Sequence, residues 1–210
     1  MIDWNDYEKF FIGLVAIVNP IGIVPVFAGL TQNFTQAERS VIGLRAALTV
    51  GAVLILALFT GEAVLRFFGI SLDSFRVAGG MLILLMAISM LHGGMSRTQQ
   101  TSEEALAAEE KEKIAVVPIG MPLLAGPGAI STIIIYSHRG QGPTHYMLLL
   151  SIALMVTLIA WLALRAAPAI ADRLGRTGLN IVTRIMGLIL AAIGVEIMAN
   201  GLKQLFPGWG

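Results

Sequence analysis

The sequence predicts an all-α membrane protein with six transmembrane helices, arranged as two inverted three-helix repeats. Composition is the first observation: 56% of the 210 residues are hydrophobic and only 13% are charged, with a mean hydropathy of +0.81. Soluble domains carry about 25% charged residues, so an integral membrane protein is indicated. The second observation is a set of six long apolar windows. The third is that two of these windows, the first and the fourth, are interrupted by proline and glycine.

A transmembrane helix needs about 20 mainly apolar residues. The windows that reach this length are 9–30, 42–62, 74–92, 115–137, 145–166 and 182–202. Between the third and fourth windows the chain is charged, which is typical of a solvated segment. The predicted organisation is one membrane domain with a first repeat (1–92), a charged cytoplasmic linker (93–114) and a second, inverted repeat (115–210).

The breaks in the first and fourth windows are the most informative local feature. An Asn-Pro-Ile-Gly motif starts at Asn19 in the first window, and a Gly-Pro-Gly motif starts at Gly126 in the fourth. Proline removes a backbone donor, and glycine leaves helical geometry easily. In a bilayer, the freed backbone groups survive only against protein or a watery cavity. Paired breaks in two halves of a chain indicate the binding site of a transporter.

The two halves also match in sequence. A shift of 107 residues places Pro20 on Pro127, and a shift of 108 places Arg76 to Gly79 on Arg184 to Gly187. Each half holds three spans, which is an odd number, so the second half must be inverted in the membrane. Inverted repeats are typical of secondary transporters.

Four motifs resemble the MarC family of bacterial inner-membrane proteins, and the resemblance extends over essentially the whole chain. They are Asn19 to Phe27, Ser74 to Gly80, Pro122 to Ser131 and Thr183 to Gly187. The resemblance implies a multi-pass protein of the bacterial cell inner membrane. It also implies kinship with transporters of small neutral amino acids such as glycine and alanine. The sequence is thus interpreted as that of a secondary transporter, an exporter or exchanger that works by alternating access.

The substrate site is expected where the two breaks meet. An unwound segment offers N–H donors for a carboxylate and C=O acceptors for an ammonium group. The predicted substrate-binding residues are Asn19, Pro20, Ile21, Gly22, Ile23, Gly126, Pro127, Gly128, Ser131 and Thr132. The alternative is that each motif is only a kink that lets helices pack closely.

Three charged residues in or near the apolar windows have two interpretations each. Glu196 lies inside the sixth window and suggests ion or proton coupling. It is also near enough to the outer end to reach water, and Asn200, one turn further on, is placed to hydrogen-bond it. Arg76 and Arg184 are repeat mates. They either close a gate through ion pairs or anchor their helices at the membrane interface.

The remaining expectations are largely exclusions. There is no cysteine, and His92, His138 and His145 lack ligand-like spacing, so no metal site and no cofactor are expected. No nucleophile and base lie within reach of each other, so no catalytic residue is expected. A net charge of +1 argues against nucleic acid as a partner. The bias of Lys and Arg in the loops places both termini in the periplasm.

The expected partners are a small-molecule solute and the lipid bilayer. The sequence leaves the oligomeric state open, a homo-oligomer included. Two other functions stay open as well. Broken helices also line pores, so an ion or small-solute channel is one alternative. A non-transport membrane scaffold is the other, although it leaves the paired breaks unexplained.

Overall fold

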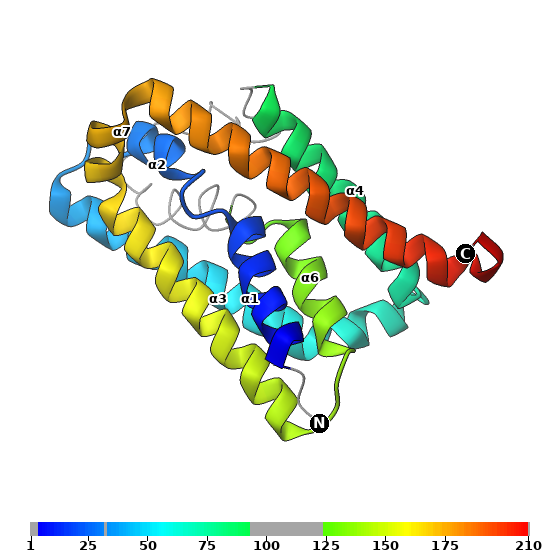
Figure 1. The fold of residues 1–210 in the computed structure, drawn as a ribbon. Helices are drawn as coiled ribbons and strands as arrows, with labels where there is room; N and C mark the ends of the chain where they lie inside the picture. The colour runs from blue at the N-terminus through cyan, green and yellow to red at the C-terminus, as the bar shows by residue number, and fades with distance from the viewer. Residues whose placement is uncertain (1–3, 32, 93–123, 210) are drawn as a thin grey trace.

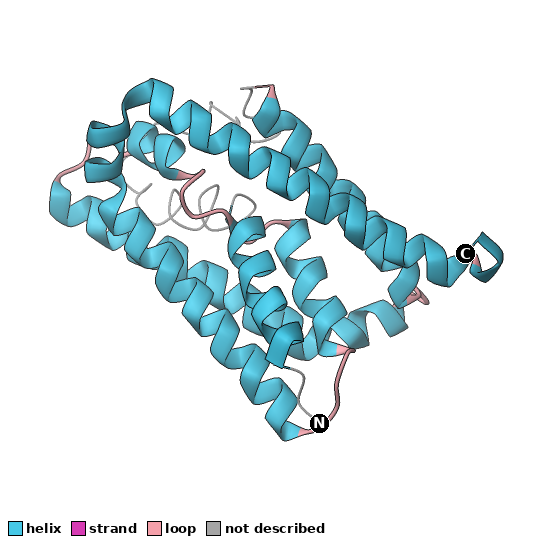
Figure 2. Cartoon of the chain, viewed as in Figure 1, coloured by secondary structure: helices cyan, strands magenta, loops and turns pink. Residues whose placement is uncertain are grey.

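The computed structural model describes residues 4–31, 33–92 and 124–209. These residues form helices joined by loops and turns (Figure 2). The elements are α1 (Trp4–Val18), α2 (Val24–Leu30), α3 (Gln36–Phe67), α4 (Leu72–Leu91), α6 (Pro127–Ser137), α7 (Pro143–Leu205) and the short 3-10 helix η3 (Pro207–Trp209). The predicted all-α class is confirmed for this part of the chain.

Within the described residues, four helical segments are long and apolar enough to cross a membrane. They are Gln36–Phe67, Leu72–Leu91, Pro143–Gly175 and Thr177–Leu205. Helix α6 is apolar but has only 11 residues. The predicted linker 93–114, and the start of the window 115–137, lie outside the described residues. The count of six spans and the inverted repeat therefore stay predictions.

Helices α3 and α4 begin at polar N-caps that the apolar windows did not include. At the start of α3, the Glu38 N–H donates to Thr35 Oγ1 at 3.4 Å, and the Thr35 N–H donates to Glu38 Oε2 at 2.8 Å. This capping box satisfies two N–H groups that have no partner within the helix. It extends α3 well upstream of the predicted start at residue 42. Ser71 caps α4 in a similar way by accepting from the Ser74 N–H at 3.1 Å.

The connection between the fifth and sixth windows is shorter than their bounds at residues 166 and 182 suggest. Helical structure runs from Pro143 to Leu205, and the residue inside it with non-helical angles is Gly175, with φ 59° and ψ −178°. A glycine adopts positive φ at little steric cost, so one residue suffices to turn the chain. Figure 1 shows the sharp change of direction at this point. The apolar windows did not include the polar helical turns on either side of Gly175, which lengthen the segments Pro143–Gly175 and Thr177–Leu205.

Helix α4 packs backbone to backbone on the last part of α7. A Cβ atom placed on Gly80 would lie 2.6 Å from the Gly194 carbonyl oxygen, and one on Gly194 would lie 2.8 Å from the Gly80 oxygen. Further along, a Cβ on Gly201 would lie 2.9 Å from the Asp73 oxygen. The two helices therefore run antiparallel. Small residues at such a crossing are typical of membrane helices, which associate through close van der Waals packing.

Helices α1 and α6 lie side by side in the interior of the bundle (Figure 1). Phe10 stacks on Tyr136 with ring centroids 4.5 Å apart. Near the other end of α1, a Cβ on Gly128 would lie 3.2 Å from Ile17 Cγ2. These two contacts show that α1 and α6 run antiparallel. They place the end of α1 beside the start of α6.

Candidate functional site

The first window is interrupted between α1 and α2, at Asn19–Ile23. Asn19 has a positive φ of 48°, a backbone region that asparagine tolerates better than most residues. Its side chain turns back on its own chain, where Oδ1 accepts a hydrogen bond from the Gly22 N–H at 3.1 Å. A Cβ on Gly22 would collide with the Asn19 side chain, so a larger residue here would displace the Asn19 amide. The Asn19 amide therefore holds the turn in shape.

The other end of the Asn19 amide reaches α4. Nδ2 lies 3.7 Å from Met90 Sδ, a distance compatible with a weak hydrogen bond to sulfur. Pro20 and Ile23 are buried, whereas Ile21 is 44% exposed. The side chain that was predicted to contact a solute is thus engaged with protein at both ends. What the first break offers to a ligand is mainly its backbone.

The second motif forms the start of α6. Gly126 is the N-cap with φ −71° and ψ 173°, and its carbonyl oxygen accepts from Ala129 at 3.0 Å and from Ile130 at 3.2 Å. Pro127 follows as the first helical residue, the position at which its missing N–H costs least. The chain upstream of Leu124 lies outside the described residues. The structure therefore describes only the resuming side of the second break.

Three predicted residues on α6 are packed against protein. A Cβ on Gly128 would lie 2.6 Å from Ile83 Cγ1 of α4. Ser131, which is 3% exposed, lies so close to Gly79 of α4 that a Cβ on that glycine would be 2.6 Å from the serine Cβ. Thr132 Oγ1 donates to the Gly128 carbonyl oxygen at 2.8 Å. Close packing on α4 is therefore one established role of this motif.

A cavity of about 660 Å³ lies between α1, α4, α6 and the last part of α7. Its lining residues are Lys9, Phe10, Gly13, Ile17, Arg76, Thr132, Ile135, Tyr136, Arg139, Ala192, Ile193, Glu196, Ile197, Asn200, Lys203 and Gln204. We refer to it below as the cationic cavity. Of the residues that the sequence singled out, the structure brings Thr132, Arg76 and Glu196 together here. Ile17 and Thr132 form the part of the lining nearest to the two breaks.

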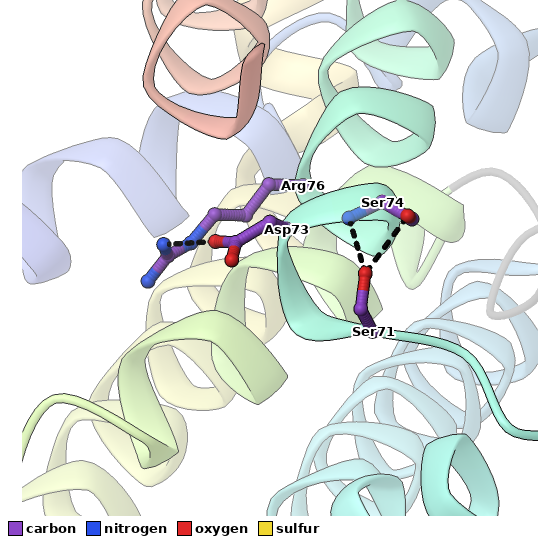
Figure 3. A network of polar contacts seen from close by, with 4 residues as sticks. All are labelled: Ser71, Asp73, Ser74 and Arg76. Atoms are coloured by element: carbon purple, nitrogen blue, oxygen red, sulfur yellow. Dashed lines mark hydrogen bonds and ion pairs between the residues drawn. The ribbon is translucent and has the colours of Figure 1, made fainter. Parts of the chain in front are cut away.

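The charged groups of the cationic cavity are held by polar contacts. Arg76 Nη1 donates to Asp73 Oδ1 at 2.8 Å. Figure 3 shows both side chains on one side of α4, with the Ser71–Ser74 cap on the other. Arg139 lies over the Tyr136 ring, 4.2 Å from its centroid. These contacts orient two guanidinium groups at the cavity wall.

Glu196 and Arg184 differ in how far they match their predicted roles. Glu196 Oε1 accepts a hydrogen bond from Asn200 Nδ2 at 3.0 Å, so the predicted Glu196–Asn200 contact is confirmed. Arg184 is exposed on α7 and is not among the residues that line the cationic cavity. The repeat mates Arg76 and Arg184 thus have different surroundings. No contact of Arg184 in the described residues indicates a gate.

No functional role was predicted for Lys9, Tyr136, Arg139 or Lys203. In the sequence they are polar and aromatic residues of the kind expected at the ends of transmembrane helices, so they indicate membrane topology and not a binding site. Tyr7 and His145 were missed as a pair because they are 138 residues apart. The Tyr7 hydroxyl lies 2.6 Å from His145 Nδ1, and His145 Nε2 lies 3.1 Å from the Tyr136 carbonyl oxygen. This chain of contacts ties α1 to the start of α7.

The chain is similar to membrane proteins from bacteria and archaea over nearly its full length. It is 43% identical to the UPF0056 membrane protein YhcE of Escherichia coli, with 98% of this chain and 96% of the relative covered. It is 42% identical to the UPF0056 membrane protein BU267 of Buchnera aphidicola, with 99% and 97% covered. It is 38% identical to the UPF0056 membrane protein MJ1677 of Methanocaldococcus jannaschii, with 96% and 98% covered.

No solved structure was found to match the chain. The family described as "MarC family integral membrane protein" matches residues 4–206. This match agrees with the four long apolar helices and with the resemblance of the sequence motifs. The chain is a multi-pass integral membrane protein and belongs to the MarC family.

Proposed function

We propose that the protein is a secondary transporter that moves a small neutral amino acid, such as glycine or alanine, by alternating access. It would act as an exporter or exchanger in the bacterial inner membrane, with both termini in the periplasm. The observation that carries the proposal is the antiparallel packing of α1 on α6, which brings the end of α1 beside the start of α6.

The register of α1 against α6 supports convergence. The contacts Phe10–Tyr136 and Ile17–Gly128 fix an antiparallel alignment. Carried on by two residues, past the ends of both helices, this alignment would put Asn19 beside Gly126. The first residues of the two motifs would then face each other, as expected for two inverted repeats related by a pseudo-two-fold axis. Both motifs also contact α4, the first through Met90 and the second through Ile83.

The backbone at this point offers groups that suit a zwitterion. The last carbonyl groups of α1 lack partners within that helix. At the start of α6, Pro127 has no N–H, and the Ala129 and Ile130 N–H groups donate to the Gly126 carbonyl oxygen, so the Gly128 N–H is the donor proposed for a carboxylate. The N-terminus of α6 also carries a partial positive charge, which favours a carboxylate, whereas carbonyl oxygens favour an ammonium group. Gly126 and Gly128 keep side-chain bulk away from these groups. A solute with little or no side chain would fit best.

The cationic cavity approaches the breaks from one side. The cationic cavity reaches Ile17, two residues before the first break, and Thr132, whose hydroxyl contacts the Gly128 carbonyl. Its volume of about 660 Å³ is in the range of small-molecule sites, about 300–1,000 Å³. The cavity also includes Lys9 and Lys203, near the two termini of the chain. Under the proposed orientation it would open towards the periplasm.

Exchange in proteoliposomes tests the proposal. Vesicles preloaded with unlabelled glycine should accumulate external radiolabelled glycine in a saturable manner, and unlabelled alanine should compete. Empty vesicles of the same lipids provide the background. A panel of small amino acids with no exchange above this background would reject the substrate class. Non-saturating currents through single molecules would identify a channel instead.

A further inference from the structure

We propose that the cationic cavity is a binding station for the α-carboxylate of the solute, separate from the helix breaks. In it Arg76 would contact the carboxylate and Glu196 the ammonium group. This inference rests on the proposed transport of a zwitterion. It assigns a ligand to a site at which the sequence indicated only a gate or anchor and an ion-coupling residue.

The charge of the lining favours a solute that carries a carboxylate. Four basic side chains and one carboxylate face the cavity. Asp73 and Asp6 partly compensate two of the cations, since Asp73 pairs with Arg76 at 2.8 Å and an Asp6 oxygen lies 3.8 Å from Arg139 Nη1. The other charged side chains of the lining are Lys9 and Lys203, which are positive, and Glu196, which is negative. A lining with an excess of positive charge raises the local concentration of anionic groups.

Arg76 is the cation best prepared to bind a carboxylate. Its side chain is only 20% exposed, so an interaction made there is less screened by water than one at the surface. Its ion pair with Asp73 engages Nη1, while a guanidinium group has five N–H donors in a planar fork. Asp73 therefore orients the fork. Donors remain for a second carboxylate, which arginine can bind through two parallel hydrogen bonds.

Glu196 offers a group for the other end of a small zwitterion. A Cβ on Gly201 would lie 3.0 Å from Arg76 Cβ, which fixes where Arg76 meets α7. Glu196 is five residues earlier, about 7.5 Å along the helix axis and about 140° around it. It is exposed and lines the same cavity as Arg76, so we place a glycine-sized solute between the two side chains. Asn200 occupies Glu196 Oε1, so the second carboxylate oxygen can accept from an ammonium group.

Among the described residues, the repeat mates of Arg76 and Glu196 do not form a second station. The repeat mate of Glu196 is Ile88, and Arg184, the mate of Arg76, is exposed on α7 outside the cavity lining. A carboxylate station on one side of the breaks would give the transporter different apparent affinities on the two membrane faces. The inference therefore adds an asymmetry that the paired breaks alone do not provide.

Binding of three small probes to purified protein in nanodiscs tests the inference. Glycine carries both charged groups, acetate only the carboxylate, and methylamine only the ammonium group. We expect Arg76→Gln to weaken the binding of both glycine and acetate by about tenfold or more, the effect of losing a charged hydrogen bond. We expect Glu196→Gln to weaken glycine by a similar factor while acetate binds as well as or better than before.

Arg66→Gln is the matched control, because Arg66 also pairs with a carboxylate on its own helix, Glu62 of α3, but lies far more exposed and outside the cavity. It should change neither affinity. Arg76→Lys keeps the charge and should retain acetate binding better than Arg76→Gln, which separates ligand contact from a structural role. If Arg76→Gln does not fold, the other two variants still test the inference. Glu196→Gln should lose glycine affinity and keep acetate affinity, whereas any loss in Arg76→Lys should affect both probes.

Two results overturn the inference. One is that glycine and acetate bind equally well to the wild type, Arg76→Gln and Glu196→Gln while glycine exchange persists; the transport proposal then stands without the station. The other is that the wild type binds neither glycine nor acetate. Acetate binding that depends on Arg76, in a protein that exchanges no amino acid, would support the station and reject the proposed substrate class.

Discussion

Ile83 of α4 occupies the space into which a side chain at Gly128 of α6 would project. A Cβ on Gly128 would lie 2.6 Å from Ile83 Cγ1, and both residues are buried. A larger residue at position 128 therefore disturbs packing before any effect on a solute is considered. This relationship changes how the second break must be tested, since a simple loss of function would have two explanations.

Gly128→Ala combined with Ile83→Ala separates packing from solute binding. Gly128→Ala alone should destabilise the fold by about 1–3 kcal/mol through overpacking, and Ile83→Ala by about 2–5 kcal/mol through the cavity it leaves. Because the new methyl group fills part of that cavity, the double variant should be more stable than the sum of the two predicts by about 1 kcal/mol or more. Thermal unfolding measures this coupling, and glycine exchange is measured on the same samples.

Exchange should remain low in the double variant, because Ile83→Ala does not relieve the second contact of the added methyl group, 3.2 Å from Ile17 Cγ2 just before the first break. Ile83→Ala alone is the control for indirect effects. Recovery of exchange together with stability would show that Gly128 serves helix packing only.

The Asn19 turn makes a separate prediction about stability. Asn19→Ala removes the hydrogen bond to the Gly22 N–H and places an alanine at a positive φ. Together these changes should cost about 1–3 kcal/mol. Asn19→Gly loses the same hydrogen bond but removes the backbone strain, so it should cost less than Asn19→Ala. Thermal unfolding of both variants measures the difference, with Asn180→Ala on the exposed face of α7 as the control. Equal stability of the alanine and glycine variants would argue against the φ of 48° at this residue.

The contact between Tyr7 and His145 should hold the start of α1 in place. Tyr7→Phe removes the hydroxyl that lies 2.6 Å from His145 Nδ1 and leaves a buried ring nitrogen without this partner. The expected cost is about 1–3 kcal/mol. In Tyr7→Phe, amide hydrogen exchange in Trp4–Val18 should become faster than in the wild type, and the increase should be larger there than in α3. Tyr146→Phe is the control, because the Tyr146 ring packs on Phe59 and phenylalanine preserves that contact. Unchanged protection of α1 in Tyr7→Phe would contradict the proposed role.

The orientation in the membrane is tested with reporter fusions. With both termini in the periplasm, alkaline phosphatase fused after Gly210 should be active and a fluorescent protein that folds only in the cytoplasm should stay dark. A fusion within the charged segment 93–114 should give the opposite pattern, because that linker is predicted to be cytoplasmic. Fluorescence from the C-terminal fusion would show that the orientation is the opposite of the proposed one, with the cationic cavity facing the cytoplasm.

The sequence predicted those features of the fold that depend on local chemistry. Composition predicted membrane helices, and the Asn-Pro-Ile-Gly motif predicted an interruption that lies between α1 and α2. The predicted helices were too short at their ends, because the capping box at Thr35 and the polar turns around Gly175 lie beyond the apolar windows. Hydropathy detects the part of a helix inside the bilayer, whereas caps decide where the helix ends.

The candidate site was less accessible from the sequence. The Glu196–Asn200 contact could be predicted because residues four apart share a helix face, and the Arg76–Asp73 pair follows similarly. The cationic cavity could not be predicted, since it brings residues of α1 and α6 against the end of α7 through packing over long sequence separations. The engagement of Asn19 with Gly22 and Met90 was also missed. A side chain beside a break was interpreted as a ligand contact when it also stabilises the turn.

Protection of a single cysteine at position 132 tests the central claim most directly. The chain has no native cysteine, and Thr132 lines the cavity close to both breaks, so Thr132→Cys reports on the route to the site. Ser151→Cys, exposed on α7, is the control for general effects of the solute. We expect saturating glycine or alanine to slow methanethiosulfonate labelling of Thr132→Cys several-fold and leave Ser151→Cys unchanged. An unchanged labelling rate at position 132 in saturating glycine and alanine would contradict the proposal that a small neutral amino acid binds between the two breaks.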